Sequence, residues 1–316
     1  MYNLNYEKVS KKIMSKTPVL LTFFNRPEHL NEIFKVASKR TDIDAHFACD
    51  GPRNLGEKKL VDRCWELVEK YFPNTPATKK LQRSQNLGCK LAMIGNIDWF
   101  FSENHFGLIL EDDCLPSDNF FKYVGKALED FKDHKNLMSV SGTDCIPKNL
   151  NPSTNLFRVS MFPLIWGWGT WANKWKHYRL EIDDHSEIVE VASEQIFGPK
   201  YSLDKLYFKN VFNMRFGEVN KGLIDTWDYS LIASTWRKKF KVLQVNANLI
   251  KNIGFGTQAT HTKSKPPTWV PRNYFKPANF SIDLESYSAN LDRWMSTNVY
   301  NCTSFEYFKN NLKKII

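Results

Sequence analysis

The chain has 316 residues, of which 42% are hydrophobic and 14% aromatic, enough apolar material for a large packed core. Its formal net charge of +10 predicts an anionic partner, either a phosphate-bearing substrate or an anionic membrane surface. No RNA-binding signature, zinc-finger spacing or long Lys/Arg block occurs in the sequence, which argues against nucleic acid as that partner.

The cysteines and the first residues bear on the cellular location. Six cysteines are scattered without a CxxC pair, which is typical of reduced thiols. Residues 1–16 are polar and basic and lack the apolar centre of a signal peptide, and no run reaches the ~18 apolar residues of a membrane span. We therefore expect a cytoplasmic protein whose basic ends favour peripheral contact with the inner face of an anionic membrane.

The first half of the chain alternates short apolar runs with amphipathic stretches, the pattern of a doubly wound α/β sheet. The expected strands are 19–24, 45–49 and 107–110, and the expected helices are 28–39, 56–72 and 89–102. Ligands bind such sheets at the carboxyl ends of the strands. The residues that directly follow the strands are therefore the first site candidates: Asn25 and Arg26, Asp50, and the triplet Glu111, Asp112 and Asp113.

The second half is less regular. It predicts a strand at 139–142, a helix at 225–238, a strand at 240–250 and an aromatic, glycine-containing loop at 166–171. Four prolines after Lys263 interrupt regular structure, so we expect a basic arm at 1–16, a catalytic domain at 17–265 and an extension at 266–316 that ends in a basic amphipathic helix.

The sharpest feature is the carboxylate triplet at the end of a fully apolar strand. Three adjacent carboxylates repel one another unless a cation or hydrogen-bond donors balance them. Hard divalent cations with oxygen ligands, Mg²⁺ or Mn²⁺, suit such a cluster, completed by diphosphate oxygens and water. The simpler alternative is a solvated acidic turn or the cap of the helix that follows.

Other polar residues have both a functional and an ordinary interpretation. Arg26 suits a diphosphate or a surface salt bridge, and Asp50 suits a nucleoside or a tight turn. Asp228 suits the base that takes a proton from an acceptor hydroxyl, with Asp225 as its competitor, or else a helix N-cap. His261 is a candidate metal ligand or phosphate contact, although a lone histidine is more often incidental.

The tryptophans of the 166–171 loop are candidates for contact with a sugar. The glycines within this loop, Gly167 and Gly169, would let it close over a ligand and exclude water. We expect at least two of the three indoles to pack into the protein, and Trp168 is the candidate for nucleotide-sugar contact.

Four blocks of this sequence resemble the N-acetylglucosaminyltransferase I family and its bacterial relatives. They are residues 18–26 (PVLLTFFNR), 47–50 (FACD), 108–113 (LILEDD, followed by Pro116, Asp118 and Phe120-Phe121) and 162–168 (FPLIWGW). Weaker likenesses lie at 141–144, at Trp227-Asp228, and at Phe255-Gly256 followed by His261, and the whole spans about 17–265. The resemblance implies the GT-A fold of nucleotide-diphospho-sugar transferases, with a mixed, mostly parallel sheet flanked by helices.

In that family one arginine contacts the diphosphate and one aspartate the uracil, and the acidic triplet approaches the donor sugar, the ribose and Mn²⁺ in turn. An aspartate acts as base. The matching positions here are Arg26, Asp50, Glu111, Asp112, Asp113 and Asp228. The family has a second aspartate after the base, where this chain has Tyr229. The membrane anchor of the animal enzymes is not evident in this sequence.

The resemblance implies an inverting transfer from a UDP-sugar, such as UDP-N-acetylglucosamine, to a glycan hydroxyl, with Mn²⁺ or Mg²⁺ as cofactor. The expected acceptor is a glycan in bacterial surface polysaccharide or lipooligosaccharide assembly. In such assembly the acceptor can be linked to a lipid. Two alternatives stay open: a metal-dependent nucleotidyltransferase, whose glycine-rich phosphate loop is not evident here, and a non-catalytic sugar-binding module.

Overall fold

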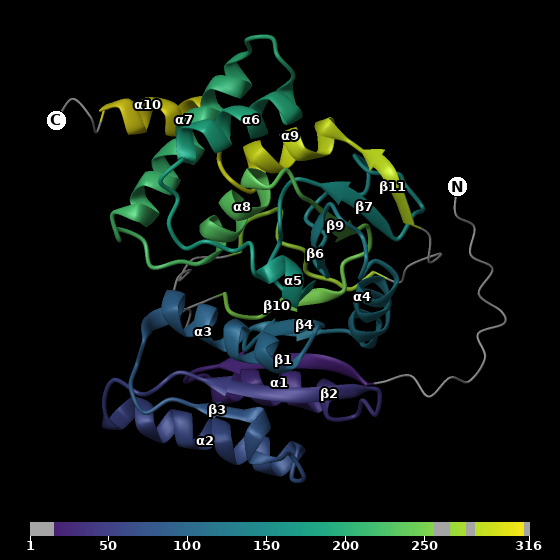
Figure 1. Cartoon of the computed structure of the whole chain (residues 1–316), viewed down its shortest axis with the longest axis vertical. Helices are drawn as coiled ribbons and strands as arrows, with labels where there is room; N and C mark the ends of the chain where they lie inside the picture. The colour runs from purple at the N-terminus through teal and green to yellow at the C-terminus, as the bar shows by residue number, and fades with distance from the viewer. Residues whose placement is uncertain (1–15, 256–265, 276–281, 313–316) are drawn as a thin grey trace.

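The computed structural model describes residues 16–255, 266–275 and 282–312, and Figure 1 shows how its elements are layered. The expected N-terminal arm lies outside these residues except for Lys16, and His261 lies outside them too. Nine strands form one sheet in the order β11-β7-β9-β6-β8-β4-β1-β2-β3. Five of its eight strand pairings are parallel, so the chain has an α/β fold with a mixed, mostly parallel sheet.

The strands are short, and a two-stranded sheet accompanies the large one. The strands of the large sheet are β1 (Thr17–Phe23), β2 (Ile43–Cys49), β3 (Lys80–Gln82), β4 (Phe106–Glu111), β6 (Leu137–Ser141), β7 (Phe157–Ser160), β8 (Trp168–Trp171), β9 (Lys241–Val245) and β11 (Ile282–Tyr287). The small antiparallel sheet pairs β5 (Cys114–Pro116) with β10 (Ile250–Asn252).

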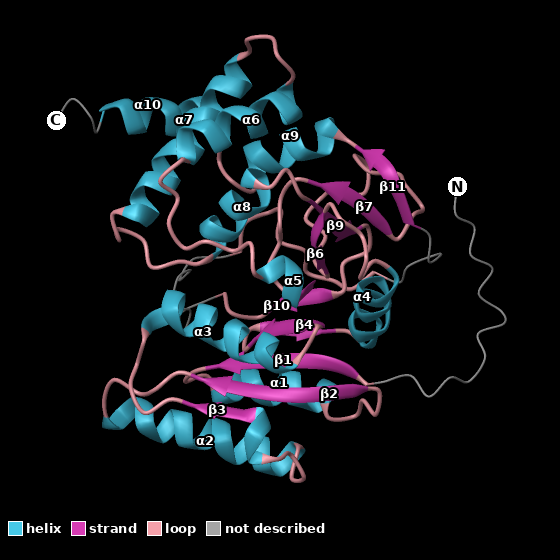
Figure 2. Cartoon of the chain, viewed as in Figure 1, coloured by secondary structure: helices cyan, strands magenta, loops and turns pink. Residues whose placement is uncertain are grey.

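Helices cover both faces of the sheet (Figure 2). Side chains alternate along β1, so Val19 and Leu21 pack with one core cluster and Leu20 with another on the opposite face. The first face is covered by α1 (Pro27–Ala37), α2 (Leu55–Tyr71) and α4 (Asp118–Asp130), and the second by α3 (Gly88–Glu103).

A helical layer stands on the later strands, at the top of Figure 1. Its helices are α6 (His185–Phe197), α7 (Leu203–Asn220), α8 (Asp228–Arg237) and α9 (Ala289–Asn298), which share a third hydrophobic cluster. The short helix η1 (Ala77–Lys79) precedes β3, the short helix α5 (Ala172–Trp175) follows β8, and α10 (Ser304–Leu312) contacts α7. No helix among the described residues is long and apolar enough to cross a bilayer.

Most elements of the first half lie where the hydrophobic pattern predicts them. The second half differs in three places. Residues 168–171 of the expected aromatic loop form the strand β8. The 240–250 stretch forms two strands, β9 and β10, that belong to different sheets. The region expected to be a separate extension after 265 returns to the large sheet as β11, parallel to β7, and α9 joins the third hydrophobic cluster.

A buried ion pair joins the ends of β6, β7 and β9, which lie next to one another toward one edge of the sheet. Arg158 on β7 and Asp144 are 4% and 5% exposed, and their atoms Nη1 and Oδ1 are 3.0 Å apart. The same guanidinium donates to the side chains of Gln244 and Asn246 and to the carbonyl of Val245. A buried charge needs such compensation, because its desolvation is costly.

We therefore predict that Arg158→Ala lowers the free energy of unfolding by about 3–5 kcal/mol, because the Asp144 carboxylate stays buried without its main partner. The matched control is Arg63→Ala, which breaks the exposed pair with Glu28 and should cost less than about 1 kcal/mol. Urea denaturation of both variants measures the difference. Equal losses would mean that the buried network contributes no more than a surface pair.

Candidate functional site

Two cavities adjoin at the carboxyl ends of β1, β2 and β4. Their volumes are about 430 Å³ and 390 Å³. The larger lies between the β4 end and the start of α8, and we call it the α8 cavity; the smaller lies between the β1 and β2 ends and α3, and we call it the α3 cavity. The residues that line both are Arg26, Cys89, Glu111, Asp113 and Asp225. The two spaces therefore meet along a seam of three carboxylates, one guanidinium and one thiol.

The acidic triplet is tied to the neighbouring strand end by Arg26. Nη1 of Arg26 lies 3.0 Å from Oδ1 of Asp112 and 3.2 Å from Oδ2 of Asp113. The other oxygen of Asp112 accepts a hydrogen bond from the Phe24 amide at 3.2 Å. Since β1 and β4 are adjacent and parallel, these bonds join their two carboxyl ends. The triplet therefore points into a structured site and is not a solvated turn.

The charges of this cluster are strongly coupled. Burial, followed by the negative charges of Asp113, Asp112 and Asp228, raises the pKa of Glu111 well above its usual value. Burial also raises the pKa of Asp112, although its ion pair with Arg26 opposes the shift. Burial alone would lower the pKa of Arg26, but the negative charges of Asp112 and Asp113 outweigh burial, and the pKa is raised. One arginine thus faces an excess of carboxylates, which favours a further cation.

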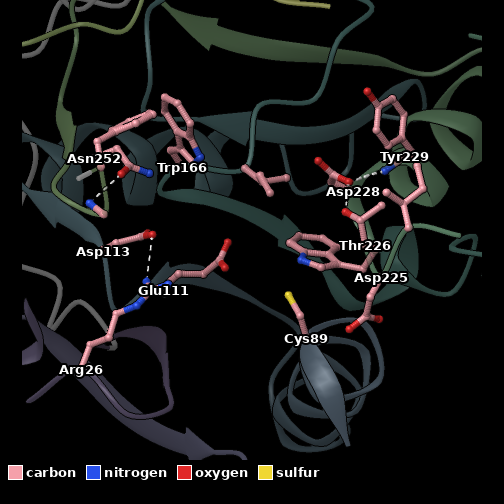
Figure 3. A pocket seen from close by; sticks show the side chains of 15 residues that line it. Arg26, Cys89, Glu111, Asp113, Trp166, Asp225, Thr226, Asp228, Tyr229 and Asn252 are labelled. Atoms are coloured by element: carbon pink, nitrogen blue, oxygen red, sulfur yellow. Dashed lines mark hydrogen bonds and ion pairs between the residues drawn. The ribbon is translucent and has the colours of Figure 1, made fainter. Parts of the chain in front are cut away.

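The residues around Asp113 fit a hard divalent ion that shares a phosphate ligand. The β5–β10 pairing brings Gly254 against Asp113, so closely that a Cβ at Gly254 would lie 2.8 Å from the Asp113 Cβ. Glu111 and Asn252 offer further oxygens on the same wall (Figure 3). Within 16–255, 266–275 and 282–312, no three His, Cys, Asp or Glu side chains form a ready metal site. The side-chain oxygens of Asp113, Glu111 and Asn252 suit Mg²⁺ or Mn²⁺, because these ions are often held by one or two carboxylates plus substrate phosphates and water.

Asp50 lies on the wall of the α3 cavity, where its carboxylate holds a loop. It accepts backbone hydrogen bonds from Gly51 at 2.9 Å, Leu87 at 3.0 Å and Gly88 at 3.1 Å. These bonds fix the turn after β2 against the start of α3. Asn25 lines the same cavity beside Arg26. The structure therefore brings Asn25, Arg26, Asp50 and the acidic triplet together, as the strand-end rule predicts.

Asp228 stands across the α8 cavity from Glu111 (Figure 3). Its Oδ1 accepts hydrogen bonds from the Thr226 hydroxyl and from the Tyr229 amide, the latter at 2.8 Å. These two donors orient the carboxylate at the first turn of α8. Asp225 lies at the seam beside Gly88, where a Cβ would be 3.2 Å from its Oδ2. The two candidate bases therefore occupy different positions, Asp228 within the α8 cavity and Asp225 at its junction with the α3 cavity.

The expectation that Trp168 contacts a nucleotide-sugar is wrong. Trp168 is on β8, between β4 and β6, and its side chain is fully buried. Its indole stacks on Trp227, with ring centroids 5.7 Å apart, and lines neither cavity. The expected flexible loop is largely this strand, so Trp168 supports the cavity wall from beneath. Trp166, two residues earlier, is the loop tryptophan that lines the α8 cavity.

Several wall residues were not predicted from the sequence. They are Cys89, Ile165, Ile224, Thr226, Tyr229, Asn252, Gly254 and Phe255. Trp166 stacks on Trp269 at 15° and meets Phe255 edge-on, which fixes its ring. Thr226 and Tyr229 could have been found from the sequence, because they lie within two residues of the candidate base Asp228. Asn252 and Gly254 gave none, because only the β5–β10 pairing brings them to Asp113.

Cys89 gives an accessible probe of the seam. Five of the six cysteines are buried, whereas Cys89 is exposed. Enclosure of its thiol in the cavity wall, followed by the charges of Glu111, Asp225 and Asp228, raises its pKa to about 12. We predict that iodoacetamide adds one label per chain, at Cys89. Because the thiolate is the reactive form, the labelling rate should still rise with pH above about 9, where the labelling rate of a free cysteine levels off. Mass spectrometry follows the label, and Cys89→Ser should abolish it; a rate that levels off near pH 9 would contradict the prediction.

Comparison with known proteins adds no assignment. A scan of the sequence against protein-family models found no match, and a search of curated proteins found none either.

Proposed function

We propose that this protein is a metal-dependent GT-A glycosyltransferase, which moves a sugar from a nucleoside-diphosphate sugar, with UDP as the expected nucleotide, to a glycan hydroxyl. One observation carries the proposal: two adjoining cavities meet at a seam that contains Arg26, Glu111 and Asp113. A transferase of this class needs a nucleotide site and an acceptor site that share the position of the bond to be broken. The diphosphate would lie at the seam.

The α3 cavity suits the nucleoside. Its wall combines the aromatic ring of Phe24 and the apolar Met93 with polar groups of Asn25, Asp50 and Asn86. Small-molecule sites of this kind pair apolar contact area with a few placed polar groups. A uracil contact by Asp50 and a ribose contact by Asp112 remain predictions from the family resemblance, since both carboxylates hold backbone amides here.

The seam suits the diphosphate. Arg26 carries a planar fork of donors that matches phosphate oxygens, and it is already held at the seam by Asp112 and Asp113. Asp113, with Glu111 and Asn252 nearby, would hold the divalent ion. A bound Mg²⁺ or Mn²⁺ supplies charge stabilisation for the departing diphosphate. His261, the other proposed ligand, lies outside the described residues.

The α8 cavity suits the acceptor and the transferred sugar. Asp228 would take the proton from the acceptor hydroxyl as its oxygen attacks the anomeric carbon and the bond to the diphosphate breaks. Thr226 and the Tyr229 amide keep that carboxylate oriented. Attack from the side opposite the leaving group inverts the anomeric centre. Glu111, across the cavity, is placed to accept a hydrogen bond from a sugar hydroxyl.

A panel of sugar nucleotides incubated with the purified chain and Mn²⁺ tests the proposal. Release of UDP, and sugar transfer when a glycan acceptor is added, is the supporting result. Release of pyrophosphate would identify a nucleotidyltransferase instead. Nucleotide binding without turnover on any donor would identify a sugar-nucleotide-binding module.

Gly254→Ala tests the role of Asp113 without changing a polar group. The added methyl would collide with the Asp113 side chain, so the carboxylate must move. We predict that Mn²⁺-dependent affinity for UDP, measured by isothermal titration calorimetry, falls about tenfold or more, equivalent to about 1.4 kcal/mol. Gly217→Ala is the control, because a Cβ there meets nothing within 4 Å. Unchanged UDP affinity in Gly254→Ala would remove Asp113 from the diphosphate site.

Asp228→Asn tests the base. The amide keeps the shape of the side chain but cannot take a proton, so we predict that kcat falls about 100-fold or more while donor affinity is retained. Steady-state assays of UDP release in the presence of acceptor measure both. Asp225→Asn is the matched control and should leave kcat within about tenfold of wild type. If Asp225→Asn loses turnover and Asp228→Asn does not, the base is Asp225.

A further inference from the structure

Four exposed leucines lie in chain segments that border the two cavities. Leu55 begins α2, Leu87 and Leu91 lie at the start of α3, and Leu223 follows α7; their exposed fractions are 80%, 42%, 49% and 70%. Single exposed leucines are ordinary on protein surfaces. These four stand out because they come from three segments that also supply the cavity walls, while none of the four lines a cavity itself.

Direct contacts hold those three segments together. The Asn86 side chain donates to the Gly51 carbonyl at 2.7 Å, which joins the turn before α2 to the start of α3. Gly88 lies against Asp225, which joins the start of α3 to the loop after α7. Figure 3 shows Cys89 and Asp225 facing each other at this junction. The leucines therefore belong to one lip of the cavity mouth, which we call the leucine rim.

The charge of the same segments indicates what the rim contacts. Residues 53–59, 86–91 and 221–225 contain five basic side chains against two acidic ones. Arg53 is paired with Glu57 and Lys58 with Asp62, so the net positive charge of these segments rests on Lys59, Lys90 and Lys221. The whole chain carries a formal net charge of +10. Leucines interspersed with basic residues are typical of surfaces that rest in the headgroup region of an anionic bilayer, where apolar side chains enter the acyl boundary and cations meet lipid phosphates.

We propose that the leucine rim docks the cavity mouth onto an anionic lipid bilayer. The α8 cavity would then open at the membrane surface, where an acceptor sugar attached to a lipid is presented. This inference rests on the proposed function only for the identity of the acceptor, because docking itself requires no nucleotide and no catalysis.

Vesicle co-sedimentation of the full chain tests the docking. The vesicles are phosphatidylcholine alone, or phosphatidylcholine mixed with phosphatidylglycerol. The wild type should bind the mixed vesicles, and bind them less at high salt. The triple variant Leu87→Asp, Leu91→Asp and Leu223→Asp should bind at least about tenfold more weakly. Aspartate is favourable at the N-cap and first turn of a helix, so the changes at 87 and 91 should leave α3 folded.

The matched control is Leu203→Asp, at the other end of α7. Leu203 is 57% exposed and begins this 18-residue helix, which is about 27 Å long at 1.5 Å per residue, whereas Leu223 follows its last residue. This variant should bind vesicles as the wild type does. No vesicle binding by the wild type, or equal loss in the control and the triple variant, would overturn the proposal. So would a wild-type dimer that the triple variant dissociates, seen by light scattering, because the rim would then be a protein interface.

UDP affinity measured in parallel separates this proposal from the proposed function. The triple variant should bind UDP and Mn²⁺ within about tenfold of the wild type, because the rim leucines line neither cavity and solvent screens the added carboxylates from the seam. If the wild type binds UDP but not vesicles, only the docking surface is refuted. If it binds vesicles but no sugar nucleotide, only the transferase assignment is refuted.

Discussion

The site depends on the contact between Arg26 and the carboxylates at the end of β4. Three adjacent acidic side chains at a strand end would repel one another and favour exposure to water. Here one of them, Asp112, is drawn back to the neighbouring strand by the Arg26 guanidinium and by the Phe24 amide. Removing ionised groups from water is costly unless they are paired and hydrogen-bonded, and these bonds provide that pairing. With Asp112 anchored, Glu111 and Asp113 are left on the wall shared by both cavities.

The sequence predicted the part of the fold that follows from local periodicity. The apolar runs of β1, β2 and β4 and the amphipathic faces of α1 and α2 lie within a few residues of their expected positions. The failures are non-local. Nothing near 168–171 shows that this segment enters the sheet antiparallel between β4 and β6. Likewise, the prolines after Lys263 suggested an end to the domain, whereas β11 pairs with β7, more than 100 residues earlier in the chain.

The same division applies to the candidate site. The strand-end rule found Asn25, Arg26, Asp50 and the acidic triplet, because parallel strands bring their carboxyl ends to one edge. It could not find Trp166, Asn252 or Gly254, which reach that edge through loops and through the β5–β10 pairing. Trp168 shows why residue type alone misleads. An indole near a ligand site can equally be the support of the wall, and full burial against Trp227 distinguishes the two roles.

The charges at the seam restrict how a diphosphate can bind. Glu111, Asp113, Asp225 and Asp228 all line the α8 cavity, and Arg26 is the one described lysine or arginine side chain on its wall. That guanidinium already bridges Asp112 and Asp113. A dianion entering alone would therefore meet an environment that is negative overall, and in a partly enclosed site such repulsion is screened less than in bulk water. Under the proposed function, nucleotide and divalent cation should bind together, each weakly without the other.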